Sequence, residues 1–169
     1  MDETGEKYTC GVLTLSDKGF EGKREDTSGP FIKEMLENFG ATIETYKIIP
    51  DQHELIRSTL IDWVDSLKLD LIVTTGGTGV SPTDVTPEAT KDIIEKELPG
   101  ISEAMRHASL KITPRAMLSR GVCGIRGQCL IINLPGSLKA AKENLEVLLP
   151  TLEHAIYKTK GGTKDCGNC

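Results

Sequence analysis

An apolar stretch that breaks into glycines constrains the fold of this chain more than any other feature. Residues 69–73 are short and rich in strand formers, as a buried strand requires, and glycines follow at three of the positions 76–79. Glycine adopts backbone angles closed to other residues, so this loop can approach a ligand closely. Thr86 then predicts a helix N-cap, with Pro87 in the first turn. The free N–H groups of such a helix start would suit a phosphate.

Size and charge limit the kinds of protein this chain can be. Its 169 residues fit one domain, which we expect to span residues 8–159 between a flexible segment at 1–7 and a disordered tail at 160–169. A net charge of −5 and a pI near 5.3 argue against nucleic-acid and anionic-membrane binding. The sequence contains no apolar run of the roughly 20 residues that span a bilayer and no signal-peptide core. We therefore expect a cytoplasmic protein.

The five cysteines do not predict a disulfide framework, because their number is odd. Cys10, Cys123 and Cys129 fall in apolar segments and are expected to be buried thiols. Cys166 and Cys169 form a CGNC motif at the end of the tail. This motif is either a pair of incidental thiols or a redox or metal contact, and the scattered histidines offer no spacing typical of zinc ligands.

The hydrophobic pattern predicts strands that alternate with helices. Strands are expected over 8–15, 41–49, 69–73 and 129–134, and helices over 27–39, 53–67, 86–98, 101–108 and 138–149. Alternation of this kind implies right-handed crossovers. The fold class is therefore α/β, with three layers: a mostly parallel sheet and helices on both faces.

Ligands of such sheets bind beyond the carboxyl ends of the strands. Asp17, Asp51 and Asp84 each follow an expected strand, so three aspartates should meet at one edge. Asp84 is a plausible oxygen ligand for Mg²⁺ on a polyphosphate. The alternatives are structural: the glycines ease a turn, Asp84 caps that turn, and Asp51 begins a capping box with Glu54.

The charged segment at 18–26 has two interpretations. Charge runs of this kind are usually mobile, solvated surface. Binding loops have a similar composition, so the segment could instead be a lid that carries Lys23 or Arg24 towards phosphates.

Several motifs together resemble one family. They are SD at 16–17, EDTSGP at 25–30, TTGGTGVSPTDVTPEAT at 74–90, MLSRGVCGIRG at 117–127 and NLPGS at 133–137. In this collinear order, over roughly residues 8–157, the chain resembles the molybdopterin adenylyltransferases of molybdenum-cofactor synthesis, which are related to the gephyrin G domain and to MoaB-type proteins. The resemblance implies a MogA-like fold that forms a homotrimer or hexamer and transfers AMP from Mg-ATP to the terminal phosphate of molybdopterin, with release of pyrophosphate. It also allows a non-catalytic molybdopterin-binding module, and it suggests the downstream molybdenum-insertion protein as a partner.

The resemblance also assigns residues to the site. Asp51 and Asp84 are similar to the family's essential aspartates, and Asp84 is the one linked to the metal. Arg120 is either a weak site candidate or a surface or subunit contact. The residues implied to bind substrate are Ser16, Asp17, Gly76, Gly77, Thr78, Gly79, Ser81, Glu88, Ser119, Asn133, Pro135, Gly136 and Ser137.

Overall fold

A computed structural model describes residues 8–163, and the CGNC motif lies outside this range. Its strands are β1 (Thr9–Leu15), β2 (Thr42–Ile49), β3 (Leu71–Thr75), β4 (Lys96–Glu97), β5 (Cys123–Arg126) and β6 (Cys129–Leu134). Its helices are α1 (Asp17–Phe20), α2 (Ser28–Phe39), α3 (His53–Asp65), α4 (Thr86–Lys91), α5 (Pro99–Leu110), the 3-10 helix η1 (Pro114–Leu118) and α6 (Leu138–Thr159).

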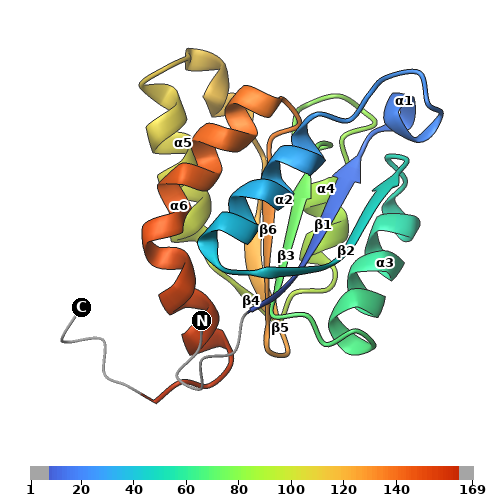
Figure 1. The fold of residues 1–169 in the computed structure, drawn as a ribbon. Coiled ribbons are helices and arrows are strands. Elements are labelled where there is room, and N and C mark those ends of the chain that lie inside the picture. The colour runs from blue at the N-terminus through green and yellow to red at the C-terminus, as the bar shows by residue number, and fades with distance from the viewer. Residues whose placement is uncertain (1–7, 164–169) are drawn as a thin grey trace.

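The strands form one sheet in the order β2-β1-β3-β6-β5-β4. The first four are mutually parallel, β5 runs antiparallel to its neighbour β6, and the edge strand β4 runs antiparallel to β5. Helices α2, α5 and α6 cover one face, and α3 and α4 cover the other (Figure 1). The predicted three-layer α/β class and the mostly parallel sheet are confirmed.

Alternation along the central strands produces two separate cores. On β1, Val12 packs towards α2 and α6, and Leu13 packs with α3, because successive strand residues point to opposite faces. Both side chains are fully buried. Cys10, Cys123 and Cys129 are also buried, as predicted, and burial raises the pKa of each thiol, to about 12 for Cys10. These thiols are therefore packing residues rather than nucleophiles.

Two local predictions, on the helices expected over 86–98 and 53–67, are wrong. The helix expected over 86–98 ends at Lys91, because the N–H groups of Glu95 and Leu98 donate to β5 and pull the chain into the edge strand β4. The helix expected over 53–67 ends at Asp65, which leaves Leu67 49% exposed beyond its end. The charged segment at 18–26, by contrast, keeps both of its interpretations: it begins with a short helix, which the Ser16 side chain caps by accepting from the N–H of Gly19 at 3.0 Å. Within residues 8–163, no helix is long and apolar enough to cross a membrane.

Candidate functional site

The four parallel strands end at one edge of the sheet, and their loops lie side by side there. The ladder extends past the strands: Ser16 N–H donates to the carbonyl of Ile49 at 3.0 Å, and Gly76 N–H donates to the carbonyl of Leu134 at 3.2 Å. The N–H of Gly76 is therefore committed to the sheet and cannot hold a phosphate, contrary to what the resemblance suggested. Gly136 completes the contact, since a Cβ there would lie 3.1 Å from the Cα of Gly76.

The glycine loop leaves three N–H groups open. Gly76 and Gly77 have φ values of 102° and 62°, which only glycine adopts without strain. The N–H groups of Gly77, Thr78 and Gly79 donate to no acceptor within residues 8–163. Consecutive free backbone donors form an anion-binding concavity, so this loop suits a phosphate.

Thr86 is buried and braces this loop, which corrects its prediction as an N-cap. The N-cap of α4 is Val85. The hydroxyl of Thr86 donates to the carbonyl of Gly76 at 3.0 Å, and its N–H donates to the carbonyl of Gly77 at 3.2 Å. The start of α4 therefore closes the loop rather than offering the Thr86 N–H to a ligand.

Asp51 and Asp17 meet as predicted, through reciprocal bonds. The N–H of Asp51 donates to Oδ1 of Asp17 at 3.0 Å, and the N–H of Asp17 donates to Oδ2 of Asp51 at 3.3 Å. The expected capping box is wrong, because Gln52 is the N-cap of α3 and makes no side-chain cap bond. Instead, the other carboxylate oxygen of Asp51, Oδ1, is buried without a hydrogen-bond partner among the described residues. Burial first, and then the charges of Asp17 and Asp84, raise the pKa of Asp51.

Asp84 ends the glycine loop in a tight turn. Its Oδ2 accepts from the N–H of Ser81 at 2.8 Å, and its own N–H donates to the carbonyl of Ser81 at 2.9 Å. The capping role weighed for Asp84 is therefore real. It coexists with a position facing two cavities, so a structural role and a ligand role are compatible.

Two cavities flank the glycine loop. The first, of about 610 Å³, lies over the ends of β1, β2 and β3 and is lined in part by Ser16 and Asp51. The second, of about 450 Å³, lies towards α5, η1 and α6, and its lining includes Thr78, Gly79, Ser119 and Pro135. The residues that line both are Gly77, Asp84, Gly136 and Ser137. A thin wall of predicted site residues thus separates two spaces.

Four predicted residues line neither cavity: Asp17, Ser81, Glu88 and Asn133. Asn133 is 1% exposed, and its amide donates to the hydroxyls of Thr74 and Thr90 at 3.0 Å each. Its Oδ1 accepts from the N–H of Val122 at 3.2 Å, so this side chain ties β6 to its neighbours beneath the site. It is not placed to contact a substrate.

Glu88 is not placed to bind a substrate group either, because its carboxylate is paired with Arg120. Slight burial raises the pKa of Glu88, but the hydrogen bond and charge of Arg120 outweigh it and hold the pKa below its ordinary value. The ion pair thus keeps Glu88 charged and directed at Arg120.

The segment 24–28 contributes to the first cavity. Of its residues, the sequence raises only Arg24 for a ligand role, as part of a lid, and none is among the substrate contacts that the resemblance implies. Arg24 lies 3.5 Å from the hydroxyl of Ser16, whereas Lys23 pairs with Glu21 on the surface. Asp26 accepts from the hydroxyl of Tyr46 at 2.6 Å. The EDTSGP motif was the available signal, but residue type alone could not separate its cavity-facing side chains from a solvated charge run.

The composition of the first cavity fits Mg²⁺ bound together with substrate phosphates. Arg24 is the basic side chain in its lining, against four carboxylates: Glu25, Asp26, Asp51 and Asp84. An anionic phosphate needs a cation in such surroundings, and carboxylate oxygens with phosphates are the ligands that Mg²⁺ prefers. The unpartnered oxygen of Asp51 supports this fit. Within residues 8–163, no group of three or more His, Cys, Asp or Glu could hold a metal by itself.

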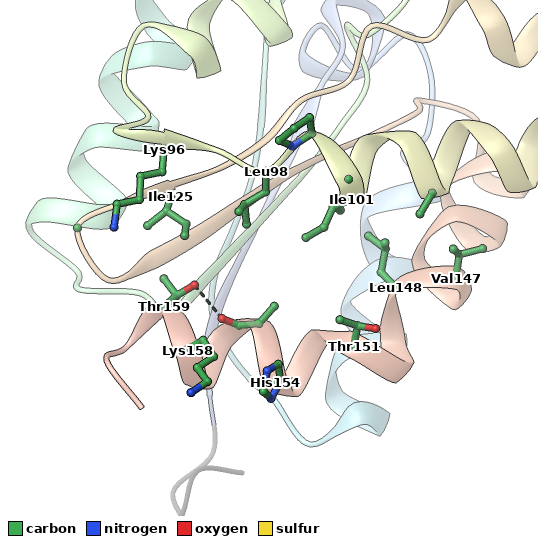
Figure 2. Close-up of a pocket in the computed structure, with 15 residues that line it drawn as sticks. Lys96, Leu98, Ile101, Ile125, Val147, Leu148, Thr151, His154, Lys158 and Thr159 are labelled. Carbon is green, nitrogen blue, oxygen red and sulfur yellow. Dashed lines mark hydrogen bonds between the residues drawn. The ribbon is translucent and has the colours of Figure 1, made fainter. Parts of the chain in front are cut away.

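A third cavity lies at the opposite end of α6 and contains none of the predicted site residues. It has a volume of about 630 Å³ between the β4–β5 edge, the start of α5 and the last turns of α6. Figure 2 shows Leu98, Ile101 and Ile125 on one side of it and residues of α6, from Leu148 to Thr159, on the other. Its lining is mostly apolar but also includes Lys96, His154 and Lys158, and it shares no residue with the two strand-end cavities.

A family model described as "Probable molybdopterin binding domain" matches residues 11–154. The chain belongs to this family. It is 45% identical over 148 residues to the molybdopterin adenylyltransferase of Helicobacter pylori strain J99, covering 86% of this chain and 84% of that protein. It is similar to the solved structure of the molybdopterin biosynthesis enzyme MoaB from Thermus thermophilus, with a TM-score of 0.87, 48% identity, and coverage of 91% of this chain and 97% of that one.

Longer proteins also contain a region similar to this family member. The molybdenum cofactor synthesis protein cinnamon of Drosophila melanogaster is 46% identical over 153 residues, which cover 90% of this chain. The match spans only 26% of that relative, so the chain corresponds to about a quarter of its length.

Proposed function

We propose that this chain is a molybdopterin adenylyltransferase, which transfers AMP from Mg-ATP to the terminal phosphate of molybdopterin. The observation that carries the proposal is the wall shared by two cavities: Gly77 and Asp84 line both, and free N–H groups follow one another on Gly77, Thr78 and Gly79. A reaction of two phosphorylated substrates needs two adjoining spaces with a common phosphate-binding boundary. The name of the Helicobacter relative supports the same reaction.

In this reaction, a phosphate oxygen of molybdopterin attacks the α-phosphorus of ATP, and the bond to the β-phosphate breaks to release pyrophosphate. The chain's own residues bind and align the two phosphates: the open N–H groups of the glycine loop donate to phosphate oxygens, and Arg24 offsets negative charge in the first cavity. Asp51 and Asp84 would hold Mg²⁺, which neutralises charge on the transferred phosphate. Positioning and charge neutralisation supply most of the catalysis in phosphoryl-type transfers.

The proposal includes features of the family resemblance that are expectations for this chain: a homotrimer or hexamer, a cytoplasmic location and a downstream molybdenum-insertion partner.

A second candidate function is a molybdopterin-binding module without catalysis. The description of the matching family, which names binding alone, favours it.

The test is pyrophosphate release by the purified protein with molybdopterin, ATP and Mg²⁺. We expect wild-type protein to release pyrophosphate and form an adenylylated pterin, and Asp84→Asn to lose turnover. The asparagine still offers an oxygen to the Ser81 N–H, so the melting temperature should hardly change. Asp92→Asn is the control, since Asp92 pairs with His53 at 3.1 Å outside both cavities. Molybdopterin binding without pyrophosphate release by wild-type protein would favour the binding module instead.

A further inference from the structure

Arg120 lines neither cavity, yet it is bonded to both ends of the glycine loop. Its Nε donates to the carbonyl of Gly79 at 2.6 Å, and one terminal nitrogen donates to the carbonyl of Asp84 at 2.6 Å. The other terminal nitrogen pairs with Glu88 in the first turn of α4. The backbone N–H of Arg120 donates to the carbonyl of Thr78 at 2.9 Å.

These contacts leave the loop's ligand-directed groups open. Arg120 takes only carbonyl oxygens and the Glu88 carboxylate, so it engages neither the free N–H of Gly79 nor the carboxylate of Asp84, and both of these residues line the second cavity. The guanidinium fork is planar and offers its donors at fixed angles, so it sets the spacing between the carbonyls of Gly79 and Asp84. Lysine has one ammonium group and cannot reproduce that spacing.

We propose that Arg120 is a positioning residue that holds Asp84 at the boundary of the two cavities. The role rests on the proposed adenylyltransferase function, because Asp84 is the carboxylate that this function uses at the transferred phosphate. Arg120 acts through the backbone of the loop and touches no substrate. This assignment differs from the surface or subunit contact that the sequence left open for it.

The first experiment is hydrogen exchange of the ligand-free protein across residues 77–88. The N–H groups of Ser81, Asp84 and Thr86 are bonded inside the loop, so their exchange reports its opening. Arg120→Lys should speed their exchange on the order of tenfold, the effect of losing charge-assisted hydrogen bonds. Arg126→Lys is the matched control, since Arg126 bridges Asp65 and the carbonyl of Ile93 away from the site.

The second experiment measures the kinetics of pyrophosphate release. Displacement of Asp84 should lower kcat of Arg120→Lys by roughly 10- to 100-fold, the scale of a small misplacement of a reacting group. The KM values for ATP and molybdopterin should stay within about threefold of the wild-type values, because the variant keeps the contacts that bind the substrates equally in the ground state and the transition state. Glu88→Gln, which keeps both carbonyl bonds of Arg120, should lose less activity than Arg120→Lys.

Unchanged exchange in Arg120→Lys would overturn the proposal, as would faster exchange with unchanged kcat. A rise in KM alone would also overturn it and make Arg120 a substrate contact. If wild-type protein releases no pyrophosphate, the proposed catalysis fails, whereas the exchange measurement still decides whether Arg120 holds the loop.

Discussion

The close approach of Gly76 to the end of β1 can be tested by adding one methyl group. A Cβ at Gly76 would lie 3.3 Å from the carbonyl carbon of Leu15 and closer still to its oxygen. Both groups are backbone held in the sheet, so neither can move away as a flexible side chain would. Gly76 also has a φ of 102°, which strains any residue other than glycine.

Gly40 separates these two effects, because its φ is 104° and a Cβ there would meet nothing within 4 Å. Gly40→Ala should therefore show the backbone strain alone, about 1–3 kcal/mol of unfolding free energy. Gly76→Ala should add a steric penalty of about 1–3 kcal/mol to that strain. For a chain of this size, the added penalty corresponds to a further drop in Tm of roughly 2–12 °C.

The assay is thermal unfolding followed by circular dichroism, with urea titrations to give the unfolding free energies. Both variants should melt below the wild-type protein, and Gly76→Ala should melt below Gly40→Ala. Equal losses in the two variants would refute the idea that the Leu15 carbonyl makes glycine necessary at position 76.

Two further predictions concern Asp51, which lines the first cavity, and Asn133, which lies beneath the site. The raised pKa of Asp51 means that folding favours its protonated form, so this group's stabilisation is present below the ordinary value of 3.8 and is lost as pH rises through the raised pKa. Asp51→Asn should therefore raise Tm relative to wild type at pH 7 and gain nothing at pH 3; a pH-independent difference would contradict this. Asn133→Ala should lower the free energy of unfolding by about 1–3 kcal/mol in urea titrations, because the N–H of Val122 is left buried without its acceptor. Unchanged stability with lost molybdopterin binding would instead make Asn133 a ligand contact, as the resemblance implied.

The sequence predicts the fold well where the hydrophobic periodicity and the position of a following turn residue indicate the same end of a strand. The apolar runs ending at Leu15, Thr75 and Leu134 become adjacent parallel strands, and the loops after them meet as expected. Prediction fails where hydrogen bonding to a segment distant in the sequence determines the local secondary structure. The helical pattern after Thr86 ends early because Glu95 and Leu98 bond to β5, which follows some 25 residues later in the chain.

The site, like the fold, is predicted where topology determines it and not where contacts between distant residues do. Strand order places Asp17, Asp51 and Asp84 at one edge, and this follows from topology alone. Which groups remain free for a ligand depends on three-dimensional bonding, which residue type does not encode. Asn133 and Glu88 have suitable chemistry but are committed to other protein groups.

The wall shared by the two cavities has a thermodynamic consequence. A ligand in either space contacts the same loop, at Gly77 and Asp84, and favours the loop geometry that fits it. If a ligand in the first cavity changes the affinity of the second cavity for its own ligand by some factor, the second ligand must change the affinity of the first cavity by the same factor. This follows because the coupling free energy is reciprocal. Cooperativity between nucleotide and pterin would therefore be a property of a loop only a few residues long, and its sign would be readable from either binding isotherm.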